Sequence, residues 1–156
     1  MIEIEIPGRE QNLKIEHLVL DYNGTIARDG RLLPEAAERI TRLAEMVHVY
    51  VLTADTYGNV RKQCQGLGAE IRTFPKAGAA LFKEQIVKEL GAGVCAVGNG
   101  FNDIPMCRAA EISFGIMEAE GICTGLIGCV DVLVSSPADA LDLLLKPDRL
   151  RATLRS

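Results

Sequence analysis

The sequence predicts a three-layer α/β fold, in which helices cover both faces of a mostly parallel sheet. Short apolar runs alternate along the chain with segments whose apolar residues recur at helical spacing, as in strand–helix–strand units. Several runs are continuously apolar, which is typical of strands buried on both faces. Since 156 residues with 48% hydrophobic content can build a full core, we expect one domain over 1–156.

The N-terminal part predicts two strands, a turn and a helix. Isoleucine alternates with glutamate over 2–6, which predicts a strand with one buried face. A Pro-Gly pair then turns the chain, so we expect a strand or hairpin over about 1–16. The apolar run at 17–20 predicts a parallel strand, and we interpret 21–30 as a turn. A helix should begin at Pro34, because proline fits the first helical position.

The rest of the chain repeats this alternation. Strands are expected at 49–52, 70–74, 94–98, 111–116 and 131–134, and helices at 57–68, 79–91, 103–110 and 137–145, followed by a solvated basic helix near the C-terminal end. We expect the strands at 49–52 and 94–98 to lie beside the strand at 17–20, at the centre of the sheet.

Composition excludes several classes of function. The net charge is −4 and tryptophan is absent, so neither a basic face nor aromatic platforms for nucleic acid are expected. The acidic start does not look like a signal peptide, and the longest uncharged run of the later half is too short for a membrane helix. The five cysteines form no CxxC pair, which indicates reduced thiols and a cytoplasmic protein.

Three polar clusters follow predicted strands, at 21–25, 53–55 and 99–103. Because parallel strands place their carboxyl ends at one edge of the sheet, these clusters should meet in one crevice. They contain carboxylates, carboxamides, hydroxyls and glycines. Oxygen ligands of this kind favour Mg²⁺ over zinc. The set indicates phosphoryl transfer, with a carboxylate nucleophile and a divalent ion.

These clusters resemble the motifs of the haloacid dehalogenase-like hydrolase superfamily. "DYNGT" (21–25) is similar to its D-x-D-x-T motif, "VLTAD" (51–55) to its second motif, and "GNGFND" (98–103) to its G-D-G-x-N-D motif. The stretch 82–116 is especially similar to the phosphorylation domain of P-type ATPases. The resemblance implies a Rossmann-like fold, and the intervals between the motifs leave no room for a cap domain.

The resemblance also implies a role for each motif residue. Asp21 would be the nucleophile, Lys83 would neutralise it and the phosphate, and Thr53 would bind a phosphate oxygen. Lys83 matches the spacing of the third motif, with Lys76 as the second candidate. Other phosphate-site residues would be Gly24, Thr25, Ala54 and Asn102, and the Mg²⁺ ligands would be Asp21, Asn23, Asn99 and Asp103.

Two residues depart from the family pattern. Asn23 replaces the aspartate that acts as general acid and base, and a carboxamide cannot exchange a proton in that way. Asn99 replaces a carboxylate ligand of the metal, so Mg²⁺ should bind weakly. We therefore expect a slow Mg²⁺-dependent phosphatase acting on a phosphorylated small molecule or a phosphoprotein. The alternative is a non-catalytic module that binds phosphate or another protein.

Each motif residue also has an ordinary structural interpretation. Asp21 could form a turn, Thr53 and Asp103 could cap helices, and Lys83 could be a solvated helical lysine. For Asp55 the capping role is favoured over catalysis. Self-association is also expected, because a site without a lid gains a wall from a neighbour and the strand at 2–6 could lie at a sheet edge.

Overall fold

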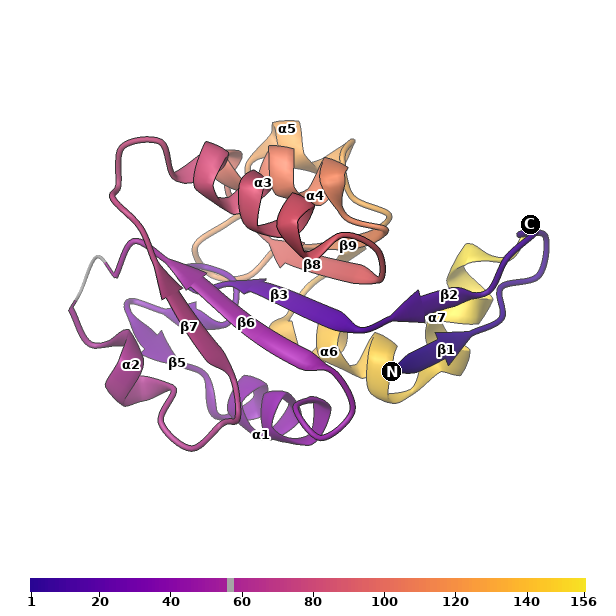
Figure 1. Cartoon of the computed structure of the whole chain (residues 1–156), viewed down its shortest axis with the longest axis horizontal. Coiled ribbons are helices and arrows are strands. Elements are labelled where there is room, and N and C mark those ends of the chain that lie inside the picture. The colour runs from indigo at the N-terminus through magenta and orange to yellow at the C-terminus, as the bar shows by residue number, and fades with distance from the viewer. Residues whose placement is uncertain (56–57) are drawn as a thin grey trace.

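A computed structural model describes residues 1–55 and 58–156 and shows a central parallel sheet (Figure 1). Within the described residues this sheet has six strands in the order β10-β9-β8-β3-β6-β7. Their bounds are β3 (His17–Asp21), β6 (His48–Thr53), β7 (Glu70–Thr73), β8 (Val94–Gly98), β9 (Ile112–Ile116) and β10 (Val132–Val134). β3 lies between β6 and β8 at the centre of the sheet. This confirms the prediction that the strands at 49–52 and 94–98 lie beside the strand at 17–20.

The register of the central strands places their carboxyl ends together. Leu18 of β3 lies opposite Val49 of β6 and Cys95 of β8. Asp21 is therefore level with Leu52, one residue before Thr53. All five residues of β8 are buried, as expected of a strand with helices on both sides. The sheet thus brings Asp21, Thr53 and the segment that follows β8 to the same edge.

Helices cover both faces of the sheet, which confirms the three-layer prediction (Figure 1). One face carries α1 (Pro34–Leu43), α2 (Val60–Gln63) and α6 (Pro137–Leu145), and the other carries α3 (Ala79–Leu90), α4 (Ile104–Ala109) and α5 (Thr124–Ile127). Each layer has its own apolar core, and the core on the α1 side is the more extensive of the two. No described helix combines the length and apolar character that crossing a membrane requires.

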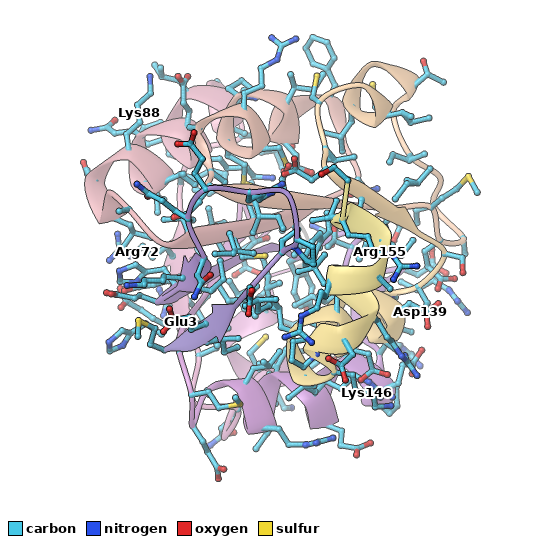
Figure 2. All side chains as sticks on the ribbon, turned by 90° about the vertical axis from the view of Figure 1, so that its right-hand side faces the viewer. Glu3, Arg72, Lys88, Asp139, Lys146 and Arg155 are labelled. Atoms are coloured by element: carbon cyan, nitrogen blue, oxygen red, sulfur yellow. The ribbon has the colours of Figure 1, made fainter. Side chains whose placement is uncertain are left out.

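The N-terminal residues form a hairpin apart from the main sheet. β1 (Ile2–Ile4) pairs antiparallel with β2 (Leu13–Ile15), as the sequence predicted for 1–16. α7 (Pro147–Leu154) lies beside this hairpin (Figure 1), where Arg151 donates a hydrogen bond to the Glu5 carbonyl. Leu150 of α7 is fully buried, so this helix is solvated on only part of its surface. Figure 2 views this end, where outward side chains of both signs are interspersed.

Three local features differ from the sequence-based expectation. A short hairpin, β4 (Ala27–Arg28) and β5 (Arg31–Leu32), begins inside the segment 21–30 that was interpreted as a turn. Its turn has positive φ at Asp29 and Gly30, the conformation that an Asp-Gly pair supplies in two-residue hairpins. α2 spans one turn instead of the expected 57–68, whose first residue lies outside the described part. α5 was not predicted.

Candidate active site

The three polar clusters converge on one pocket of about 470 Å³ at the carboxyl edge of the sheet. Asp21 ends β3, Thr53 ends β6, and the 99–103 segment follows β8. The pocket is lined by Asp21, Asn23, Thr53, Ala54, Phe74, Ala79, Lys83, Asn99, Gly100, Phe101 and Asn102. Seven of these residues are ones that the sequence assigned to the site, so the structure brings most of the predicted set together.

Lys83 reaches the pocket from α3 and is almost fully buried. Its ammonium donates to Asp21 Oδ1 at 2.7 Å, Asp103 Oδ1 at 2.8 Å and Asn102 Oδ1 at 3.0 Å. An ammonium has three protons, so all of them are in use. Lys76 is exposed and does not line the pocket, so the structure places Lys83, and not Lys76, against the carboxylates.

The charge balance around Lys83 fixes its protonation. Burial alone would lower the pKa of the Lys83 ammonium, but the adjacent Asp21 and Asp103 carboxylates outweigh burial and raise it. Burial, followed by the nearby Asp103 carboxylate, raises the pKa of Asp21 to about 6, against the lowering effect of Lys83. Above that pH Asp21 is a carboxylate held beside a permanent cation, which is the form that a nucleophile requires.

Asp103 organises the loop after β8. Its Oδ2 accepts the backbone N–H groups of Asn99 at 3.0 Å and Gly100 at 2.9 Å, while its Oδ1 accepts from Lys83. A Cβ at Gly98 would lie 2.5 Å from the Asp103 Cγ, so glycine is needed there for this approach. The Asp103 side chain does not cap α4. Because both oxygens are occupied, the carboxylate positions the loop and Lys83 in this arrangement.

Thr25 and Asn99 connect the first cluster to the third. Thr25 Oγ1 lies 2.9 Å from Asp21 Oδ2 and 3.0 Å from Asn99 Oδ1, and its single proton serves one of them at a time. Asn99 Nδ2 donates to the Gly121 carbonyl at 3.1 Å. Gly24 has φ +76°, and a Cβ there would lie 2.3 Å from Asn99 Nδ2. The Asn99 amide therefore fills space that only a glycine at 24 leaves free.

Asn23 contributes an acceptor that the described residues leave unused. Its Oδ1 is buried and no described group donates to it. Asn23 also lines the pocket. A buried carbonyl oxygen without a donor costs about 1–3 kcal/mol. The site therefore contains an open acceptor position next to Asp21, suited to a donor or cation brought by a ligand.

The second cluster is partly structural. Thr53 Oγ1 accepts the Asp55 backbone N–H at 2.9 Å, and Asp55 Oδ1 accepts the backbone N–H of Val60, the first residue of α2, at 3.2 Å. The interpretation of Asp55 as a cap is therefore confirmed. Thr53 and Ala54 still line the pocket. A hydroxyl that accepts one hydrogen bond can donate its proton to a phosphate oxygen.

The donor set allows Mg²⁺ but holds it with few charges. No group of three His, Cys, Asp or Glu side chains within 1–55 and 58–156 is placed to bind a metal. Among the lining residues, oxygen ligands are available on the Asp21 carboxylate, on the Thr53 hydroxyl and on the amides of Asn23, Asn99 and Asn102. Mg²⁺ commonly takes one or two carboxylates and completes its shell with water and substrate phosphate. These residues fit such a site, with phosphate supplying the missing oxygens.

Sequence reasoning missed four pocket residues: Phe74, Ala79, Gly100 and Phe101. Gly100 and Phe101 stand inside the "GNGFND" motif, so that motif was the available signal for both. Phe74 directly follows β7, and strand ends are where ligands bind in parallel sheets. Nothing in the sequence pattern distinguished Ala79 from Ala80, the other alanine of α3.

A model of haloacid dehalogenase-like hydrolases matches residues 3–111. Two uncharacterized proteins of Methanocaldococcus jannaschii are also similar in sequence. One is 39% identical over 62 residues, which are 40% of this chain and 67% of the relative. The other is 49% identical over 39 residues, which are 25% of this chain and 89% of the relative.

Solved structures of phosphatases share the fold. A cobalt-bound deoxy-D-mannose-octulosonate 8-phosphate phosphatase from Haemophilus influenzae superposes with a TM-score of 0.72 at 17% identity, covering 92% of this chain and 95% of that one. The 3-deoxy-D-manno-octulosonate 8-phosphate phosphatase of Moraxella catarrhalis, in complex with magnesium, phosphate and KDO, gives 0.70 at 16% identity, covering 90% and 94%.

Proposed function

This chain belongs to the haloacid dehalogenase-like hydrolase family, and we propose that it is a slow Mg²⁺-dependent phosphatase acting through an aspartyl-phosphate on Asp21. The observation that carries the proposal is the buried Lys83 ammonium, which contacts both the Asp21 and the Asp103 carboxylates. Lys83 lies 62 residues from Asp21 in the sequence, yet it is buried against that strand-end carboxylate. A lysine with only a solvated role would be exposed, so this contact supports Asp21 as an activated nucleophile.

In the first step the Asp21 carboxylate attacks the phosphorus atom of a phosphate monoester. An Asp21–phosphate bond forms, the ester P–O bond breaks, and the alcohol leaves with a proton taken from solvent. An incoming phosphate oxygen needs a donor, and Lys83 has no free proton. Of the three acceptors of Lys83, only Asn102 is exposed. A phosphate oxygen would therefore take the hydrogen bond that Asn102 accepts, because Asn102 can bond to water instead.

In the second step water attacks the phosphorus of the aspartyl-phosphate and releases inorganic phosphate and Asp21. This step calls for a base to take the proton from water. Asn23 lines the pocket beside Asp21 but cannot titrate. Loss of a general acid–base group costs about 10²–10⁴ in rate. We therefore expect the phosphoenzyme to form faster than it hydrolyses.

Asp21, Asn23 and Asn99, which line the pocket, would hold Mg²⁺ together with Asp103, and the ion when bound neutralises charge on the phosphate. We extend the proposal to a phosphorylated small molecule or a phosphoprotein as substrate, to the cytoplasm as the location, and to self-association. Neither a nucleic acid nor a membrane is proposed as a partner. Membership of the P-type-ATPase-like branch of the family, which residues 82–116 indicate, stays a prediction.

The test is hydrolysis of 4-nitrophenyl phosphate with added Mg²⁺ by the wild type and by Asp21→Asn. We expect low but measurable turnover in the wild type and none in the variant. Asp148→Asn is the matched control, because Asp148 is an exposed residue of α7 and its loss should leave turnover unchanged. Absence of Asp21-dependent turnover would favour the alternative, a non-catalytic module, for which the neutral Asn23 and Asn99 are the supporting observation.

A further inference from the structure

Phenylalanines gather around the pocket. The chain has four, and Phe74 and Phe101 both line the pocket. Phe82 of α3 stacks on Phe74, with ring centroids 6.0 Å apart and planes 6° from parallel. The fourth, Phe114, is fully buried in the core. Three of the four therefore lie at or behind the wall of the pocket.

Phe101 is exposed to an unusual degree for its size. It is 75% exposed, more than any other large hydrophobic side chain in the described residues. It opens the short helix η1 (Phe101–Asp103), and this turn is fixed by Asp103, which accepts the N–H groups of Asn99 and Gly100. An aromatic ring held in water by a well-bonded turn beside a pocket gains free energy when a ligand covers it.

The lining of the pocket has a polar part and an uncharged part. The polar part contains Asp21, Lys83 and the amide side chains of Asn23, Asn99 and Asn102. The rest of the lining, apart from Thr53, is Ala54, Phe74, Ala79, Gly100 and Phe101. Lys83 is the only cation among the described lining residues, and its three protons are committed to Asp21, Asp103 and Asn102. A second anionic group on a substrate would find no further cationic side chain among the described lining residues.

We propose that the site selects phosphate monoesters whose leaving group is uncharged and presents a flat apolar face, as an aryl group does. The phosphate would reach Asp21 and Lys83 while the ring packs against Phe101 and Phe74. This inference rests on the proposed function and names its substrate class. We therefore expect sugar-acid phosphates and diphosphates to be poor substrates, because they carry further negative charge.

The kinetic test compares two substrates across three proteins. The substrates are 2-naphthyl phosphate and glycerol 2-phosphate, and the proteins are the wild type, Phe101→Ala and Leu81→Ala. Leu81 is the matched control, because it is 67% exposed on α3 but lines a different pocket. We expect Phe101→Ala to lower kcat/KM about tenfold for the naphthyl ester only, from the apolar area left uncovered. Leu81→Ala should change neither value.

A binding arm distinguishes failure of the inference from failure of the proposed function. Methylphosphonate, benzylphosphonate and phosphonoacetate differ in the group attached to a non-hydrolysable phosphonate. We expect wild type to bind benzylphosphonate about tenfold more tightly than the other two, and Phe101→Ala to lose that preference. If this binding preference is seen but no Asp21-dependent turnover is found, the proposed function is overturned, while recognition of an aryl phosphonate by Phe101 still holds. Equal binding of the three phosphonates, or an unselective effect of Phe101→Ala, would overturn the inference.

Discussion

Two clusters of charged side chains in this molecule have opposite charge balance. In the pocket, the single Lys83 ammonium contacts two carboxylates, Asp21 and Asp103. At α6, the single Asp142 carboxylate is contacted by three cations, Arg39 at 2.9 Å, Lys146 at 3.4 Å and Arg149 at 3.5 Å. Figure 2, which views the end of the molecule with the N-terminal hairpin and α7, shows Lys146 there.

The carboxylates in the two clusters therefore respond in opposite directions. Burial and Asp103 raise the pKa of Asp21. Burial also acts to raise the pKa of Asp142, but its hydrogen bond to Arg39 and the surrounding cations outweigh burial and lower it. A carboxylate with excess cations stabilises the fold, whereas two carboxylates sharing one ammonium retain unneutralised charge. The excess negative charge in the pocket favours binding of a cation and leaves Asp21 available as a nucleophile.

The largest expected effect is on turnover. Asn23→Asp should raise hydrolysis of 4-nitrophenyl phosphate by about 10²–10⁴, because a carboxyl can pass a proton to the leaving group and take one from water. The side chains are nearly isosteric. Steady-state rates across a Mg²⁺ titration check this. An unchanged rate in Asn23→Asp, with normal folding, would show that proton transfer at position 23 does not limit turnover.

Lys83→Met should destabilise the fold by about 3–5 kcal/mol, because it leaves two buried carboxylates without their cation. Urea unfolding monitored by circular dichroism measures this. Lys88→Met is the matched control on the same helix. Lys88 is 64% exposed and pairs with Glu84, so its loss should cost no more than about 0.5 kcal/mol. Equal losses in the two variants would contradict the difference drawn between buried and exposed lysines.

Asn99→Asp should make stability depend on Mg²⁺. A third carboxylate beside Asp21 adds negative charge, and the new oxygen replaces the amide that donates to Gly121, so the metal-free variant should be less stable by about 1–3 kcal/mol. Saturating Mg²⁺ should restore much of this, since a ligand that binds only the folded state stabilises it. Thermal unfolding with and without Mg²⁺ measures the difference. A variant whose loss is the same with and without Mg²⁺ would argue against a metal position beside residue 99.

Arg39→Ala should destabilise the fold only modestly, by about 1 kcal/mol at pH 7, because Lys146 and Arg149 remain near Asp142. The lowered pKa of Asp142 contributes stability above its unfolded value of about 3.9, and this contribution disappears as pH falls through the folded pKa. The stability difference between wild type and variant should therefore shrink below about pH 4. Urea midpoints at pH 7, 5 and 3 test this, and a difference independent of pH would exclude Asp142 as the cause.

Most of the fold was predictable because hydrophobic periodicity determines it. The continuous apolar runs at 17–20, 49–52 and 94–98 lie in β3, β6 and β8, which are buried on both faces. The β4–β5 hairpin was missed although Asp29 and Gly30 are a recognisable hairpin turn. Short elements such as α2 and α5 have too few residues for a periodic signal, so tertiary packing decides them.

The site was predictable where it follows strand ends and less so where it depends on packing. Asp21 and Thr53 end strands, so topology alone placed them at one edge. Lys83 could not be separated from a solvated helical lysine by spacing, because only the fold shows that its face of α3 is buried. The backbone N–H groups that bind Asp103 and the apolar lining residues such as Phe101 likewise depend on long-range geometry.

The measurement that tests the central claim most directly is the mass of the protein after brief reaction. Wild type is mixed with 4-nitrophenyl phosphate and Mg²⁺, quenched in acid, and analysed intact and after proteolysis by mass spectrometry. We expect one added phosphoryl group on Asp21, which accumulates because Asn23 cannot promote its hydrolysis, and which falls to a lower level in Asn23→Asp. Turnover without any phosphoryl group on Asp21, or a group on another residue, would contradict the proposed nucleophile.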